Sequence, residues 1–442
     1  MEADGWGDDR DQSRPQDDRE SARARSHSTT HGWGDDRDWL RREGDRLLAF
    51  ARGSFDPRGG FAWLDAAGRP ELGRDRQLWI TCRMTHCFAL AHLAGRPEPA
   101  AAAPGWAELA AHGVAAISGA FHDPVHGGWF AALRPDGSPA GPAKEAYPQA
   151  FVVLAAASAT TAGVLGAAEL LERALACQTA HFWDQAAGLV VESWDQAFAR
   201  LDDYRGANAN MHTVEAYLAA ADASGDPLYR QRALGIAARL VQDQARAHDW
   251  RLPEHYTPDW RPLPDYNRER PDDPFRPFGA TVGHGLEWSR LLLQLRGALG
   301  AQAPDWLLPA AEGLFQRATA DGWAVDGRLG FIYTTDWQGR PVIRQRLHWV
   351  AAEAVNAAAS LCRTTGQPVY ADWYQRWWDH IDQSLIDRAG GSWWHELDPA
   401  NRPAATVWPG KPDIYHGFQA TLVPLCPVGV SLAQALKDGL ID

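Results

Sequence analysis

The sequence has 442 residues, of which 22% are charged and 45% hydrophobic, proportions that are typical of a globular protein. The net charge of −13 argues against nucleic acids and anionic membranes as partners. There is no apolar run of about 18 residues that could cross a bilayer, and the N-terminus lacks the apolar core of a signal peptide. The five cysteines show no CxxC or metal-ligand spacing, which favours a reducing compartment. We therefore expect a cytoplasmic protein.

The first segment of the chain is polar and almost free of aliphatic residues. Residues 1–35 cannot bury enough apolar surface to fold, so we predict a disordered N-terminal extension there. A helical pattern begins directly afterwards, with Trp39, Leu40, Leu47 and Leu48 at helical spacing. The folded part of the chain is therefore expected to span residues 36–442.

From residue 55 onward a short signature recurs along the chain. Each copy has a glycine turn, a short aromatic stretch and an Asp/Gly/Pro turn, which together predict a small β-hairpin. Clear copies lie at 55–70, 122–139, 183–195, 327–341 and 387–403. A degenerate copy at 248–262 fills the one double gap, so the hairpins follow one another at a nearly regular interval. This regularity indicates an internal repeat.

The segments between the hairpins have helical character. Residues 104–121 and 228–244 are amphipathic, whereas residues 146–163 and 348–366 are apolar nearly all round, as expected of helices covered on every side. Several end in a glycine that stops a helix, such as Gly225 and Gly366. Two helices in each repeat give about twelve in total. We predict an all-α (α/α)6 barrel, with short β-hairpins in its connections, as a single domain.

Polar residues gather just before, or at the start of, the apolar helices of this predicted barrel. In such a toroid the inner helices present these ends to a common cavity, so the residues are candidates for one site. The six clusters contain Trp79, Arg83 and His86; Tyr147 and Gln149; Asn208, Asn210, His212 and Glu215; His284 and Glu287; His348, Trp349 and Glu353; and Trp408, Lys411, Asp413, Tyr415, His416 and Gln419.

The histidines indicate proton transfer. An imidazole titrates near neutral pH and can both accept and donate a proton, so His284 and His416, from different repeats, are the candidate catalytic residues. Glu287 follows His284 by three residues, on the same helix face, where it could orient an imidazole or accept a sugar hydroxyl. Arg83, with His212 nearby, is suited to an oxygen that gains negative charge.

Other side chains of the clusters are suited to a sugar. Asn208, Tyr147 and Gln419 are typical of hydroxyl recognition, and the indoles of Trp79 and Trp349 can shape the pocket. The chain has 22 tryptophans, however, and most of them are expected simply to fill the helical core.

Structural and metal-binding interpretations compete with this one. His86 and His348 can be core residues hydrogen-bonded to the backbone, and Arg83 can pair with Glu215 or Glu353 across the barrel. The histidines together with Glu287 can also ligate zinc or manganese. The sequence has no HExxH motif to support that ligand set, and no nucleotide-binding or GxSxG motif. We therefore expect neither a metal nor a cofactor.

Four motifs resemble those of the N-acylglucosamine 2-epimerase superfamily. They are TCRMTHCFAL (81–90), NANMHTVEA (208–216), GHGLEW (283–288) and KPDIYHGFQA (411–420), and they lie in family order over roughly residues 40–430. The KPDIYH run, with TCRMTH, is similar to the branch of D-mannose isomerases and sulfoquinovose isomerases.

This resemblance implies an (α/α)6 barrel that moves a proton between C1 and C2 of an aldose without a cofactor. It implies that His284 and His416 form the acid/base pair and that Arg83, Asn208, His212 and Glu287 line the sugar site. The expected reaction is the interconversion of D-mannose and D-fructose by a monomer or homo-oligomer. A mannose/glucose 2-epimerase, a sulfoquinovose isomerase, a glycoside hydrolase using Glu287 and Glu353, and a sugar-binding protein remain alternatives. Residues 257–279, rich in proline and charge, are the candidate lid or rim.

Overall fold

The inner wall of the fold is a closed ring of helices. The computed structural model describes residues 37–98 and 103–441, so the predicted disordered extension at residues 1–35 lies outside the described part. Each inner helix packs on the next one in the chain, and the last packs on the first. These helices are α2 (Leu78–Leu93), α4 (Ala146–Thr161), α6 (Ala207–Ser224), α8 (Val282–Leu299), α10 (His348–Thr365) and α12 (Tyr415–Ala420).

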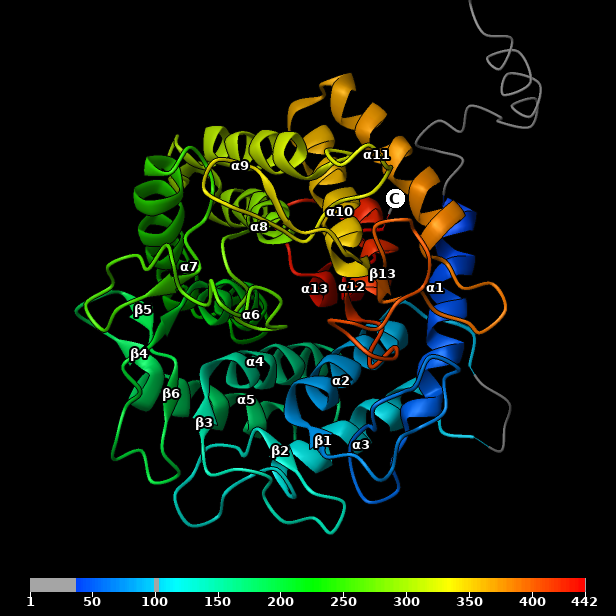
Figure 1. Cartoon of the computed structure of the whole chain (residues 1–442). Coiled ribbons are helices and arrows are strands. Elements are labelled where there is room, and N and C mark those ends of the chain that lie inside the picture. The colour runs from blue at the N-terminus through cyan, green and yellow to red at the C-terminus, as the bar shows by residue number, and fades with distance from the viewer. Residues whose placement is uncertain (1–36, 99–102, 442) are drawn as a thin grey trace, which may run out of the picture.

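A second ring of helices surrounds the first (Figure 1). Each outer helix packs on an inner one: α3 on α2, α5 on α4, α7 on α6, α9 on α8, α11 on α10 and α1 on α12. The outer helices are amphipathic and bury one stripe, because the ring shields only their inward face. They are α1 (Arg37–Ala51), α3 (Trp106–Ser118), α5 (Ala167–Cys177), α7 (Leu228–Ala237), α9 (Leu307–Gly322) and α11 (Pro368–His380).

Short helical turns of other types extend these elements. Three outer helices continue into π-helical turns, η3 (Gln178–Phe182), η4 (Ala238–Ala245) and η6 (Ile381–Leu385). The 3-10 turns are η2 (Arg52–Ser54), η5 (Gly300–Gln302) and η7 (Val423–Leu425). A final helix, α13 (Leu432–Lys437), packs on α2, α4 and α6. Gly225 and Gly366 end α6 and α10 in the left-handed conformation, as the sequence predicts.

Strands of two or three residues connect the helix pairs. The strand that precedes an inner helix pairs, antiparallel, with the hairpin that follows the next outer helix. In this way β1 (Arg76–Gln77) pairs with β2 (Ala132–Leu133), β3 (Lys144–Glu145) with β6 (Ser193–Trp194), β7 (Arg205–Gly206) with β8 (His255–Tyr256), β9 (Ala280–Thr281) with β10 (Thr334–Thr335), and β12 (Arg346–Leu347) with β13 (Glu396–Leu397). Within hairpins, β4 (Trp183–Asp184) pairs with β5 (Leu189–Val190), and β10 pairs with β11 (Pro341–Ile343).

A buried ion pair attaches the hairpins to the inner helices. Lys144, just before α4, donates to Asp123 at 2.9 Å and to the carbonyl of Gly127 at 3.0 Å. Lys411, just before α12, donates in the same way to Asp387 at 2.5 Å and to the carbonyl of Gly391 at 2.8 Å. The aspartate in each case begins the turn of the preceding hairpin. We call this contact the hairpin latch.

The predicted all-α (α/α)6 barrel with short hairpins is confirmed. Segments that are far apart in the sequence close it, since α12 packs on both α1 and α2 and the N–H of Lys411 donates to the carbonyl of Leu64 at 2.9 Å. The assignment of residues 36–442 to one domain stays a prediction. Across the described residues, every helix is too short or too polar to span a bilayer.

Candidate active site

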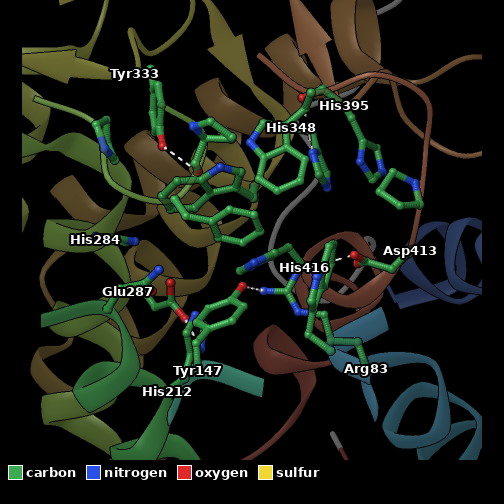
Figure 2. Close-up of a pocket in the computed structure, with 18 residues that line it drawn as sticks. Arg83, Tyr147, His212, His284, Glu287, Tyr333, His348, His395, Asp413 and His416 are labelled. Atoms are coloured by element: carbon green, nitrogen blue, oxygen red, sulfur yellow. Dashed lines mark hydrogen bonds and ion pairs between the residues drawn. The ribbon is translucent and has the colours of Figure 1, made fainter. Parts of the chain in front are cut away.

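A cavity opens where the inner helices begin, with residues from all six of them in its wall (Figure 2); the empty space in and just outside it is about 640 Å³. Each strand before an inner helix delivers the first turns of that helix to this end of the barrel. The lining residues are Trp79, Arg83, Tyr147, Asn208, His212, Pro274, Phe275, Pro277, His284, Glu287, Tyr333, His348, Trp349, His395, Trp408, Pro412, Asp413 and His416.

Two histidines of the cavity are each held by a buried carboxylate. The Nδ1 atom of His284 lies 2.8 Å from Glu254 Oε1, and the Nδ1 atom of His416 lies 2.9 Å from Glu353 Oε1. An ionised carboxylate only accepts hydrogen bonds, so each Nδ1 carries the proton and each Nε2 keeps its lone pair. This arrangement gives both histidines the tautomer that a general base needs.

The indole of Trp349 lies between the two histidines. Its ring centroid is 5.3 Å from that of His284 and 5.7 Å from that of His416. The helices that carry the histidines, α8 and α12, both pack on α10, which carries Trp349. Trp349 therefore contacts both imidazoles from the helix on which α8 and α12 pack.

Arg83 supplies positive charge to the cavity wall. Its guanidinium donates to Tyr147 Oη at 2.9 Å and to Asp413 Oδ2 at 3.3 Å. Among the described residues that line the cavity, it is the only arginine or lysine. Burial raises the pKa of Tyr147 to about 12, so its hydroxyl keeps its proton at neutral pH. The alternative pairing of Arg83 with Glu215 or Glu353 is wrong, because Arg290 occupies the position between those two carboxylates.

His212 and Glu287 lie close together at the base of the cavity. Burial lowers the pKa of His212 to about 3, and its Nδ1 lies 3.7 Å from Glu287 Oε1. Burial, together with the nearby charge of Glu353, raises the pKa of Glu287 well above its ordinary value. Glu287 therefore holds a proton more readily than an exposed glutamate, and in its protonated form it has a hydrogen bond to donate. The carboxylate that orients His284 is that of Glu254, not that of Glu287.

Aromatic side chains close the mouth. Trp79, Trp408 and Phe275 contact one another edge to face, with ring centroids 5.2 to 6.2 Å apart. Phe275 belongs to residues 257–279, the predicted lid or rim, and together with Pro274 and Pro277 it forms part of the cavity wall. That residues 257–279 as a whole form a lid or rim stays a prediction.

His348 and His395 form a stacked pair on the wall beside His416. Their ring centroids are 3.7 Å apart at an interplanar angle of 20°. Burial lowers the pKa of His348 to about 3, so this ring is neutral. His348 is thus a cavity residue, although its sequence context was equally compatible with a core histidine.

The acidic side chains beneath the cavity, together with two histidines, form two groups that could hold a metal ion. His212, Glu215 and Glu287, and likewise Glu287, Glu353 and His416, bring possible ligand atoms within 4.8 Å of one another. The guanidinium of Arg290 already lies among the three carboxylates, 3.0 Å from Glu353, 3.4 Å from Glu215 and 3.8 Å from Glu287. A metal ion there would be repelled by this charge, so the residues fit a divalent cation poorly.

Nine of the ten site residues predicted from the sequence line the cavity. The exception is Gln419, one turn beyond His416, whose amide lies below the cavity and donates to Glu215 at 3.3 Å. Asp413, His348, Glu353 and Trp408 belong to the predicted clusters but were not among the predicted site residues, and no sequence pattern indicates Tyr333, His395 or Glu254. Glu254 lies in the degenerate hairpin copy, where no spacing signal distinguishes it.

Comparison with known proteins finds the same family that the four sequence motifs resemble. The sequence profile of the N-acylglucosamine 2-epimerase (GlcNAc 2-epimerase) family matches residues 59–420. The D-mannose isomerase of Thermobifida fusca is 51% identical over 388 residues, covering 88% of this chain and 93% of that protein. The D-mannose isomerase of Pseudomonas cannabina pv. alisalensis is 47% identical over 380 residues, covering 85% and 90%.

A solved structure has the same fold. The crystal structure of a D-mannose isomerase superposes with a TM-score of 0.81 at 29% identity, covering 88% of this chain and 97% of that one. Together with the profile match, this similarity shows that the chain belongs to the N-acylglucosamine 2-epimerase family.

Proposed function

We propose that the protein is a D-mannose isomerase, which interconverts D-mannose and D-fructose by proton transfer through a cis-enediol. The observation that carries the proposal is the pair of carboxylate-held histidines, His284 with Glu254 and His416 with Glu353, in one sugar-sized cavity. The high identity to D-mannose isomerases over most of the chain supports the choice of substrate.

In the proposed mechanism His416 is the carbon base. Its Nε2 removes the proton from C2 of the open-chain aldose, and the electron pair of that C–H bond forms the C1–C2 double bond as the carbonyl oxygen O1 gains a proton. His416 then returns its proton to C1, while the O2 hydroxyl loses its proton and becomes the ketone. His284 assists ring opening and moves the proton between the two oxygens.

The remaining polar groups stabilise charge that develops on the oxygens. Arg83 offers a guanidinium, and Glu287, in its protonated form, offers a neutral donor. His212 lies next to Glu287 at the base of the cavity. Donors that are already in place in a buried site stabilise an enediolate without reorganisation of water. Asn208 and Tyr147 are placed to recognise hydroxyl groups.

The test is a D-mannose assay by proton NMR with EDTA present. The proposal expects D-fructose as the first product and no loss of rate with EDTA. His416→Ala and His284→Ala are each expected to lower kcat by about 10²- to 10⁴-fold, the range for loss of a general acid–base group. Unchanged D-mannose with the wild-type protein would refute the substrate assignment.

One second function is favoured by a specific observation. Two histidines on different sides of a bound sugar could serve the 2-epimerisation of mannose to glucose, in which the Nε2 of one ring removes the C2 proton and the other ring, protonated at its Nε2, returns a proton to the opposite face of C2. Glucose appearing as fast as fructose in the same assay would select the epimerase. A hydrolase using Glu287 and Glu353 is disfavoured, because Glu353 is fully buried and its Oε1 accepts from His416.

A further inference from the structure

Arg290 lies one turn below Glu287 on α8, outside the cavity wall. It is 4% exposed, and its Nε donates to Glu353 Oε2 at 3.0 Å. One of its terminal nitrogens donates to Glu215 Oε1 at 3.4 Å. It therefore neutralises two carboxylates that have been removed from water.

Both of these carboxylates hold the short helix that carries the proposed base. Glu353 accepts from His416 Nδ1 at 2.9 Å. Glu215 accepts from the hydroxyl of Tyr415 and, at 3.3 Å, from the amide of Gln419. The helix α12 has only six residues, so such side-chain contacts contribute a large part of its orientation. Arg290 connects α8 to three residues of α12 without touching the cavity.

We infer that Arg290 is a positioning residue that fixes the tautomer of His416 by keeping Glu353 ionised, and this inference rests on the proposed function. An ionised Glu353 must accept the Nδ1 proton of His416, which leaves the lone pair on Nε2. A protonated Glu353 would instead donate to Nδ1, so that Nε2 would carry the proton and could not act as a base.

The charges around Glu353 make its ionisation depend strongly on Arg290. Burial would raise the pKa of Glu353, and the charge of Arg290 is the largest single effect that lowers this pKa, ahead of the hydrogen bond from His416. Glu353 is fully buried and lies near Glu215 and Glu287. Without the guanidinium, burial and the neighbouring carboxylates favour the protonated form.

The other histidine supplies an internal control. His284 is held by Glu254, which is not among the carboxylates that Arg290 contacts. Loss of Arg290 is therefore expected to change the tautomer of His416 and to leave that of His284 unchanged. A general loosening of the barrel would affect both rings.

The experiment compares wild type, Arg290→Met and Arg290→Lys by ¹⁵N NMR of histidine-labelled protein, with His416→Gln and His284→Gln to assign the signals. We expect His416 to be protonated at Nδ1 in the wild type and at Nε2 in Arg290→Met, with Arg290→Lys close to the wild type because the charge is kept. In the D-mannose assay, kcat of Arg290→Met should fall by at least about 10²-fold. Its KM should change by less than about threefold, since Arg290 does not contact the substrate.

The matched control is Arg251→Met. Arg251 makes a two-pronged ion pair with Asp321, at 2.7 and 3.2 Å, away from α12. This variant should keep the wild-type tautomers and kcat. If Arg290→Met does not fold, the double variant Arg290→Met/Glu215→Gln is used instead. It removes one of the two buried carboxylates that lose their counter-ion with Arg290, and the tautomer of His416 is measured in the same way.

Retention of the Nδ1–H tautomer of His416 without Arg290 would overturn the inference, whatever happens to kcat. The NMR comparison needs no turnover. If the wild-type protein fails to convert D-mannose, the proposed function is refuted. The tautomer of His416 with and without Arg290 still decides the role of Arg290.

Discussion

His416 differs from an exposed histidine because two opposing effects act on its ring. Burial lowers its pKa below the ordinary 6.5, and the hydrogen bond and charge of Glu353 partly restore it. The neutral form is the base, so a lowered pKa extends the active form to lower pH. The proposed base is thus more readily neutral at physiological pH than an exposed histidine.

The pH dependence of kcat/KM follows from this balance. As the pH falls through the pKa of His416 the ring becomes protonated and activity is lost, so we expect the acid limb to have its midpoint below 6.5. In Glu353→Gln the restoring charge is gone, and the residual activity should show a midpoint at still lower pH. Initial rates with D-mannose across the acid range measure both midpoints. A wild-type midpoint above 6.5 would contradict this assignment.

Gly283 precedes His284 and makes room for Trp349. A Cβ at this position would lie 2.3 Å from Cζ3 of Trp349, so Gly283→Ala must displace the indole that separates the two histidines. We expect a loss of about 10²-fold in kcat from this displacement. Gly235→Ala, in α7, is the control, because its Cβ would meet nothing within 4 Å. The control should keep full activity and gain about 0.5–1 kcal/mol of helix stability. Full activity in Gly283→Ala would show that Trp349 has no spacing role.

At the scale of the element, the hairpin latch attaches the hairpins to the inner helices whose first turns form the cavity. Lys144 and Asp123 are each 1% exposed, so this contact is formed away from water. In Asp123→Asn the carboxylate is lost and the ammonium of Lys144 is left without its counter-ion. We expect the free energy of unfolding to fall by about 3 kcal/mol, as for other broken buried pairs.

Urea unfolding followed by circular dichroism measures this change. The control is Asp65→Asn, in the second turn of the first hairpin, where the partner, Arg69, is 80% exposed. Loss of an exposed pair should change the free energy of unfolding by about 0–1 kcal/mol. Equal effects of the two substitutions would show that the latch does not depend on burial.

The repeat made these elements predictable from sequence. Glycine turns and aromatic stretches identified the hairpins, and polar residues at the start of apolar helices identified nine cavity residues. The partner of each side chain was not predictable, because neither spacing nor periodicity relates Glu254 to His284 across 30 residues of chain. Gln419 shows the complementary limit: it shares a short helix with His416, yet its amide lies below the cavity.

At the scale of the whole molecule, the cavity exists because the ring closes. The first outer helix, α1, packs on the last inner helix, α12, which carries His416 (Figure 1). The number of repeats predicted a toroid. The packing of α13 on α2, α4 and α6 was not predicted, because it depends on contacts between segments that are distant in the sequence. Such contacts leave no periodic signal in the sequence.

The central claim, proton transfer by a carboxylate-held histidine, is tested most directly by the fate of hydrogen at C1. Unlabelled D-mannose is incubated with the protein in D₂O through many turnovers, and the D-fructose formed is analysed by NMR. Because a proton on His416 Nε2 exchanges with solvent, we expect deuterium to accumulate at C1 of D-fructose. A C1 that stays fully protonated after many turnovers would indicate direct hydride transfer and would contradict the claim.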